Sequence, residues 1–153
     1  MTKTHQLCTF FVDGQFFGVP VQKVQEVIRY QEMTRVPLVP QVVRGLINLR
    51  GQIVVAIDLR RRLGLSERSG DQLPMNVIVR SDDGAVSLLV DEIGDVLEVE
   101  EDTFEEPPET LQANYRELVL GVHKLPRNLL LVLDTERAVN GTENSSVLTG
   151  AEV

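Results

Sequence analysis

The sequence predicts an all-β protein made of two small barrels or curled sheets, with a few short helices. Short runs of apolar and β-branched residues recur along the chain, separated by turn dipeptides such as Asp13-Gly14. This pattern is typical of hairpins. The pattern of the first half also returns in the second half. At 153 residues, the length predicts about one domain with room for two small cores.

An internal repeat supports the division into two units. At an offset of 76 residues, five residues of the first half match five of the second: Val43, Gly45, Leu49, Asp58 and Leu63 match Val119, Gly121, Leu125, Asp134 and Val139. At an offset of 69, the segment 19–28 matches 88–97. Apolar strands alone can mimic such a match weakly, but two close offsets are typical of a duplicated unit with a small insertion. Each half then contributes about five short strands.

The N-terminal part is predicted to begin with a hairpin. Residues 6–12 and 16–19 are rich in phenylalanine and β-branched residues on either side of Asp13-Gly14. Pro20 fits the first turn of a helix. The apolar residues that follow, up to Ile28, have the spacing of a helix of about two turns.

The middle of the chain is organised around a hairpin at 45–59. Two apolar runs flank Arg50-Gly51, and Gly51 supplies the positive φ of a tight turn. Arg50 then lies at the tip, either as a contact point for another molecule or as a solvated turn residue. The two prolines of segment 33–40 exclude a central strand before this hairpin. Residues 41–44 are predicted as one helical turn.

A short helix that ends at Gly64 is predicted for 59–65. Its adjacent arginines at 60–62 could favour a phosphate or an acidic partner, but consecutive helical residues point in different directions. A solvated helix face is therefore the preferred interpretation. The polar segment 66–74 is the predicted connection between the two halves.

The second half is predicted to repeat the first. Its predicted elements are a hairpin at 75–80 and 85–90, a helix or bent strand at 93–97, strands at 119–122 and 129–133, and a helix at 135–139. The acidic segment 98–109 contains two adjacent prolines and lacks the spacing of a calcium loop, so an exposed loop is predicted there. From Asn140 onward the composition predicts a frayed tail.

Composition and charge exclude several classes of function. Acidic residues outnumber basic ones by 23 to 15, and the net charge of −8 disfavours nucleic-acid binding, which depends on neutralised phosphates. No signal-like segment opens the chain, and no apolar run approaches about 18 residues. We therefore expect a cytoplasmic protein without direct membrane insertion. The single Cys8 lies in an apolar run and is predicted as a buried structural thiol.

Catalytic and metal motifs are not found in the sequence. His5 and His123 have no acid or ligand at motif spacing. Asp58 and Asp134 each end an apolar strand before a helical stretch, a position typical of an N-cap. We therefore expect no enzymatic activity, no cofactor and no metal. A protein of this kind usually works by presenting binding surfaces.

Several motifs carry a family resemblance. They are Phe17-Gly18-Val19-Pro20-Val21, Val24-Gln25-Glu26-Val27-Ile28, Val36-Pro37, Gly45-Leu46-Ile47-Asn48-Leu49-Arg50-Gly51, Ile57-Asp58-Leu59-Arg60 and Leu88-Leu89-Val90-Asp91. With them, about residues 6–140 resemble CheW, the bacterial chemotaxis coupling family. Leu46 and Ala56 depart from the valine and proline that are frequent in the family, but both are apolar strand residues.

The resemblance implies two SH3-like five-stranded β-barrels within a single domain at about 6–140. The first barrel would span about 14–66 and the second about 75–134, with an exchange of terminal strands left open. Residues 141–153 would form a flexible tail. Proteins of the family lack enzymatic activity and couple chemoreceptors to the histidine kinase CheA by binding both.

The resemblance also implies partners and contact residues. The partners are the cytoplasmic tip of a methyl-accepting chemotaxis receptor, the regulatory domain of a CheA-type kinase and other CheW-like domains. The implied location is the cytoplasm, at receptor arrays on the inner membrane. The implied receptor-binding residues are Val24, Glu26, Ile28, Arg50 and Val90. The resemblance does not assign the kinase-contact residues.

A second hypothesis is a small β-barrel module that binds a small ligand or nucleic acid. Such a module would need a basic, aromatic-rich face. The chain has only five Phe and two Tyr, mostly at strand-like positions. The adaptor hypothesis is therefore preferred.

Overall fold

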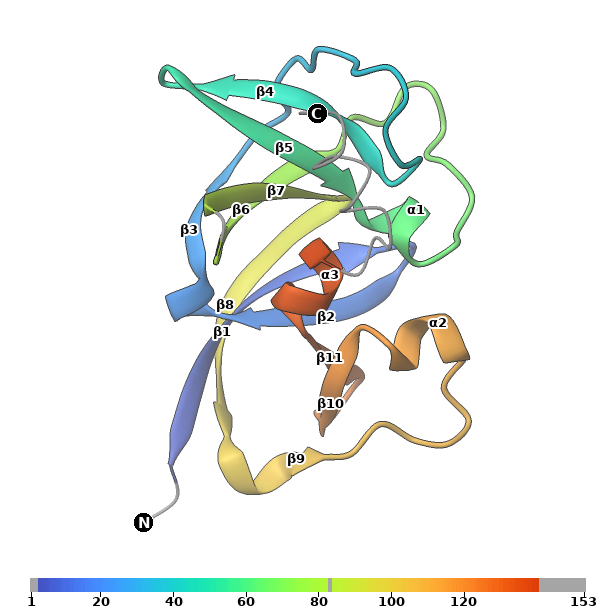
Figure 1. Cartoon of the computed structure of the whole chain (residues 1–153). Coiled ribbons are helices and arrows are strands. Elements are labelled where there is room, and N and C mark those ends of the chain that lie inside the picture. Colours follow the sequence, from blue (N-terminus) through green and yellow to red (C-terminus); the bar gives the residue numbers. More distant parts are fainter. Residues whose placement is uncertain (1–2, 83, 141–153) are drawn as a thin grey trace.

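Two β-sheets make up most of the protein in the computed structural model (Figure 1), which describes residues 3–82 and 84–140. Sheet A has six strands in the order β8-β1-β2-β11-β10-β9, and sheet B has five in the order β3-β6-β7-β5-β4. The strands of sheet A are β1 (Thr4–Val12), β2 (Gln15–Pro20), β8 (Glu92–Glu100), β9 (Phe104–Glu105), β10 (Val119–Lys124) and β11 (Leu129–Leu133). The strands of sheet B are β3 (Val24–Ile28), β4 (Val43–Leu49), β5 (Gln52–Asp58), β6 (Met75–Ser81) and β7 (Gly84–Val90).

The helical elements are short and lie between strands or after the last one. The α-helices are α1 (Leu59–Arg62), α2 (Ala113–Arg116) and α3 (Thr135–Asn140), and the 3₁₀ turns are η1 (Val21–Lys23) and η2 (Glu101–Thr103). The all-β class with two sheets and short helices is confirmed. The predicted hairpins and the helices after β5 and β11 are confirmed as well.

The chain is not divided between the two sheets at a single point. Strands β1 and β2 lie in sheet A with β8–β11, whereas the intervening β3–β7 form sheet B. Each sheet contains one parallel pair of strands. In sheet A, β2 pairs with β11, with Phe17 opposite Leu131. In sheet B, β5 pairs with β7, with Val55 opposite Val86. A cut between residues 66 and 75 would therefore leave strands of both sheets on each side.

The two sheets repeat each other strand by strand. The strand order β8-β1-β2-β11-β10 of sheet A corresponds, position by position, to the order β3-β6-β7-β5-β4 of sheet B. The pairing of β4 with β5 shifts register between Val43 and Gly45, and the pairing of β10 with β11 shifts between Val119 and Gly121. These are the positions that the 76-residue offset aligns, so the structure supports the internal repeat.

The sheets share one hydrophobic core. Phe10 and Phe17 of sheet A and Leu88 of sheet B are fully buried in the same cluster of side chains. The rings of Phe10 and Phe17 stack with centroids 5.9 Å apart. Because half of the chain would give only a marginal core, this shared cluster makes the two sheets one folding body.

The predicted helix from Pro20 to Ile28 is wrong. Only Val21–Lys23 form a 3₁₀ turn, and Val24–Ile28 pair with β6 as strand β3. The spacing of the apolar residues fits a helix, but the segment is rich in valine and isoleucine, whose branched side chains favour a pleated sheet. The helical turn predicted at 41–44 is also wrong, because β4 begins at Val43.

Two further predictions need correction. Cys8 is half-buried in β1 instead of fully buried, and burial raises the pKa of its thiol. The segment 98–109 is largely exposed, as predicted, but it is not a simple loop because β8 continues to Glu100 and β9 follows η2. The predicted tail at 141–153 lies outside the described residues.

Gly45 lies where the segment around Thr34 forms an antiparallel bridge with β4. Thr34 and Leu46 exchange backbone hydrogen bonds of 2.8 Å, and a Cβ atom added at Gly45 would lie 2.7 Å from the Thr34 carbonyl oxygen. Gly45→Ala is therefore expected to lower the free energy of unfolding by about 1–3 kcal/mol, as measured by urea denaturation. Gly70→Ala is the matched control, since nothing lies within 4 Å of its added Cβ. Equal losses in the two variants would contradict the predicted crowding.

Candidate functional site

The tip of the β4–β5 hairpin is a tight turn formed by Arg50 and Gly51. Their φ angles are +51° and +88°, as a type I′ turn requires at its two central residues. The Asn48 side-chain oxygen accepts a hydrogen bond of 2.9 Å from the Gly51 amide. The predicted hairpin is confirmed, and its turn holds the Arg50 backbone in a fixed place.

Arg50 reaches from this turn to Glu26 on β3. Its Nη1 donates to Glu26 Oε1 at 3.0 Å, and its Nη2 donates to Oε2, so both carboxylate oxygens are held. The side chains are 67% and 23% exposed, respectively. A bidentate arginine–carboxylate pair fixes orientation as well as distance. The family resemblance implied both residues for one surface, and the structure joins them as an ion pair.

The pKa of the Glu26 carboxyl lies below its ordinary value because Arg50 donates hydrogen bonds to the charged form, against a smaller opposing effect of burial. The pair is therefore intact above the ordinary carboxyl pKa and is lost as pH falls through the lowered folded pKa. In Arg50→Gln, the pKa of Glu26 is expected to rise toward its ordinary value, as measured by NMR titration of the side-chain carboxyl. Arg127→Gln, at the tip of the β10–β11 hairpin, should leave it unchanged. An unshifted Glu26 pKa in Arg50→Gln would argue against the pair.

Apolar side chains are found on the two elements that carry this ion pair, β3 and the β4–β5 hairpin. Val24 and Ile28 are half-buried and pack against the shared core and the smaller core of sheet B, respectively. Val27 is 38% exposed and Ile53 is 64% exposed. Neither of these two residues was predicted as a contact residue from the sequence. Ile53 could have been found from strand alternation, because it directly opposes the exposed Asn48 across the hairpin.

Val90 is placed differently from the other four predicted contact residues. It ends β7 with no exposed surface and packs in the shared core. A buried side chain offers no surface to a partner, so its assignment as a direct contact is corrected to a core position. The family motif that includes Val90 continues into Asp91, which belongs to a buried polar cluster.

That polar cluster joins two arginines to two aspartates at the end of β5 and β7. Arg60 donates to Asp91 through Nη2 at 2.7 Å and through Nε at 2.9 Å. Arg68 lies 2.8 Å from Asp91 and 2.9 Å from Asp58. The side chains of Arg68, Asp58 and Asp91 are at most 6% exposed. The prediction of a solvated face is therefore wrong for Arg60, which pairs inside the protein.

The cluster also connects the two sheets. The backbone amide of Asp13, in the β1–β2 turn, donates to Asp91 at 2.6 Å. The Asp58 carboxylate accepts from the Arg60 amide at 3.0 Å, which confirms the predicted N-cap of α1. The charges of this cluster compensate one another inside the fold. The cluster is therefore assigned a structural role and not a role as a binding site.

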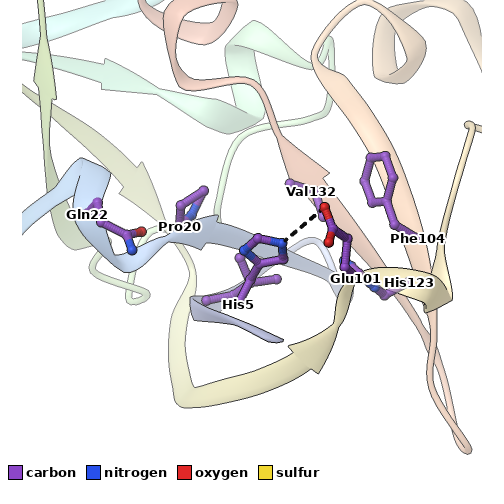
Figure 2. Close-up of a pocket in the computed structure, with 8 residues that line it drawn as sticks. His5, Pro20, Gln22, Glu101, Phe104, His123 and Val132 are labelled. Atoms are coloured by element: carbon purple, nitrogen blue, oxygen red, sulfur yellow. Dashed lines mark ion pairs between the residues drawn. The ribbon is translucent and has the colours of Figure 1, made fainter. Parts of the chain in front are cut away.

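A separate cleft lies between β1, η1, η2 and the strands β9–β11 of sheet A (Figure 2). Its volume is about 290 Å³, and its lining includes His5, Glu101, Phe104 and His123. His5 Nε2 lies 3.8 Å from Glu101, and Phe104 tilts over the His123 ring at 5.3 Å between centroids. Burial lowers the pKa of His123. Glu101 is not at motif spacing from His5, and only the fold brings the two side chains together.

Two features of residues 3–82 and 84–140 bear on other classes of function. Within these ranges, the structure has no group of three or more His, Cys, Asp or Glu side chains placed to hold a metal ion. In the same part of the chain, no helix combines the length and apolarity needed to cross a membrane.

Comparison with known proteins assigns the chain to a protein family. The sequence profile of the CheW-like domain matches residues 6–143. The chain belongs to the CheW-like family. Chemotaxis protein CheW of Bacillus subtilis is 31% identical over 143 residues, which cover 94% of this chain and 92% of the relative. CheW of Treponema pallidum is 30% identical over 142 residues, covering 90% of this chain and 84% of the relative.

A solved CheW structure shares the architecture. The crystal structure of the scaffolding protein TtCheW from Thermoanaerobacter tengcongensis matches with a TM-score of 0.81 at 26% identity. The match covers 92% of this chain and 97% of TtCheW. The resemblance seen in the sequence motifs is thus confirmed at the level of family and fold.

Proposed function

We propose that this chain is a non-catalytic adaptor that couples chemoreceptors to a CheA-type histidine kinase. Membership of the CheW-like family supports this function. The domain would span about 6–140. Its place in the cell would be the cytoplasm, at receptor arrays on the inner membrane, because one of its partners is a membrane receptor.

The observation that carries the proposal is the exposed ion pair between Glu26 and Arg50. The pair fixes orientation, and Val27 of β3 and Ile53 of β5 add exposed apolar area on the strands that carry or adjoin it. The proposed receptor surface consists of Val24, Glu26, Val27, Ile28, Arg50 and Ile53. An arginine flanked by apolar side chains suits the docking of an amphipathic helix.

Calorimetry of the purified chain against its two proposed partners tests this function. The partners are a receptor-tip fragment and the regulatory domain of a CheA-type kinase. We expect each to bind by itself and both to bind together in one complex, because an adaptor needs two separate surfaces. Binding of neither partner, or mutually exclusive binding, would refute the adaptor function.

A further inference from the structure

Sheet B carries a basic cavity that lies outside the proposed receptor surface. The cavity has a volume of about 550 Å³ and lies between the segment 30–44 and α1. Arg35, Arg44 and Arg61 line it together with a single acidic residue, Glu67. Cavities of this size are typical of small-molecule sites. A concentration of arginines is unexpected on a chain whose net charge is −8.

Internal contacts account for only part of this positive charge. Arg61 is satisfied, because it donates to Glu67 at 2.6 Å and to the Gln41 carbonyl at 2.8 Å. Among residues 3–82 and 84–140, Arg44 has one side-chain partner, Asp58 at 3.2 Å, and Asp58 is already paired with Arg68. The Arg44 side chain remains 38% exposed. Free donors therefore remain on Arg44.

Arg35 leaves even more donor capacity. Its side chain forms no hydrogen bond or ion pair with the described residues, and the residue is exposed at the cavity. The neighbouring Glu67 has a pKa below its ordinary value, first because of Arg61, with further contributions from Arg44 and Arg68. The cavity is thus positive where Arg35 and Arg44 lie, beyond what Glu67 neutralises.

The internal repeat shows that the fold does not require this charge. The 76-residue offset places Leu120 where sheet B has Arg44. Thr34 bridges β4 at Leu46, as Glu105 pairs with Val122 of β10, so Glu106 stands where sheet B has Arg35. One copy of the unit therefore folds with an apolar and an acidic residue at these positions. The fold therefore does not explain why sheet B has arginine at positions 35 and 44.

We propose that this cavity binds a small oxyanion that carries phosphate or carboxylate groups. Arg35 and Arg44 would contact the anion through their planar donor forks, which match the geometry of both groups. Arg61, held by Glu67 and Gln41, would form the fixed wall of the site. This inference does not depend on the proposed receptor and kinase contacts.

Calorimetry of the full chain with pyrophosphate and with citrate, each at ionic strength matched with sodium chloride, tests the site. Saturable binding of one probe or both is expected, and the preferred probe distinguishes a phosphate site from a carboxylate site. Arg35→Gln should weaken binding about tenfold, because it removes a charge-assisted contact, while its unfolding midpoint stays unchanged. Arg127→Gln, which removes an exposed arginine from the other sheet, should bind like the parent chain.

Two results would overturn the site. One is the absence of saturable binding of both probes to the folded chain. The other is an equal weakening by Arg35→Gln and Arg127→Gln, which would indicate nonspecific attraction by surface charge. Arg44→Gln provides a second measurement: it should also weaken binding by several-fold, with circular dichroism used to establish that the variant is folded.

Discussion

Asp91→Ala is expected to lower the free energy of unfolding by about 3–5 kcal/mol, the range found when one partner of a buried ion pair is removed. The substitution leaves Arg60 and Arg68 without their shared carboxylate inside the fold. It also removes the acceptor of the Asp13 amide, which links the β1–β2 turn to the end of β7. Urea denaturation at neutral pH measures the loss.

The pH dependence of this effect is a second readout. Burial acts to raise the pKa of Asp91, but hydrogen bonds from Arg60 and the Asp13 amide, with the charge of Arg68, outweigh it and leave the pKa below its ordinary value. The stabilisation is therefore complete above the ordinary carboxyl pKa and lost as pH falls through the lowered folded value. The difference between parent and variant should shrink in acid.

Glu92→Ala is the matched control for Asp91→Ala, because Glu92 is the next residue and is exposed. We expect a change within about 0.5 kcal/mol for this surface substitution. A loss below about 1 kcal/mol in Asp91→Ala would show that the buried arginines find other partners or water, against the expected cost of an unpaired buried charge.

Arg50→Glu is expected to weaken binding of a receptor-tip fragment by about 10- to 100-fold, as reversal of a contact charge places like charges together. The variant replaces the Glu26–Arg50 pair by two adjacent carboxylates at an exposed turn. Its fold should persist, because neither side chain belongs to the core. Calorimetry gives the affinity, and circular dichroism with thermal unfolding tests the fold.

Arg127→Glu makes the same change at the structurally equivalent hairpin tip of sheet A and should leave receptor affinity unchanged. The exchanged double variant Glu26→Arg/Arg50→Glu separates two roles of the pair. Restored affinity would mean that Arg50 acts by holding the hairpin against β3. Continued weak binding would mean that the receptor contacts the positive charge itself. Equal affinities of Arg50→Glu and the parent chain would remove Arg50 from the receptor surface.

The sequence predicted the parts of the fold whose local signals and long-range pairings agree. In the Arg50-Gly51 turn, the positive φ of Gly51 follows from the residue itself, whereas the positive φ of Arg50 does not. The predicted helix at 20–28 failed because the spacing of apolar residues fits a helix and an edge strand equally well, and the pairing with β6 decides between them. Such a pairing depends on residues about 50 positions away.

The candidate site shows the same limit. Glu26 and Arg50 were both predicted for the receptor surface, but their direct pairing depends on how β3 and the hairpin meet in space. A solvated face was predicted for Arg60 because consecutive residues of a helix point in different directions and so form no joint binding site. Its burial follows from Asp91, which comes directly after β7 and is brought beside α1 only in the folded sheet. Exposure of a charged residue therefore could not be judged from its immediate neighbours.

The placement of β1 and β2 has a consequence for how the chain folds during synthesis. All strands of sheet B are available for pairing once residue 90 has left the ribosome, because the sheet consists only of β3–β7. The first hairpin must wait for β8 and β11, its neighbours in sheet A. Until residues 129–133 emerge from the ribosome, one edge of that hairpin stays unpaired, and unpaired edges are prone to aggregation. The earliest part of the chain to be synthesised is thus among the last to reach its final pairing.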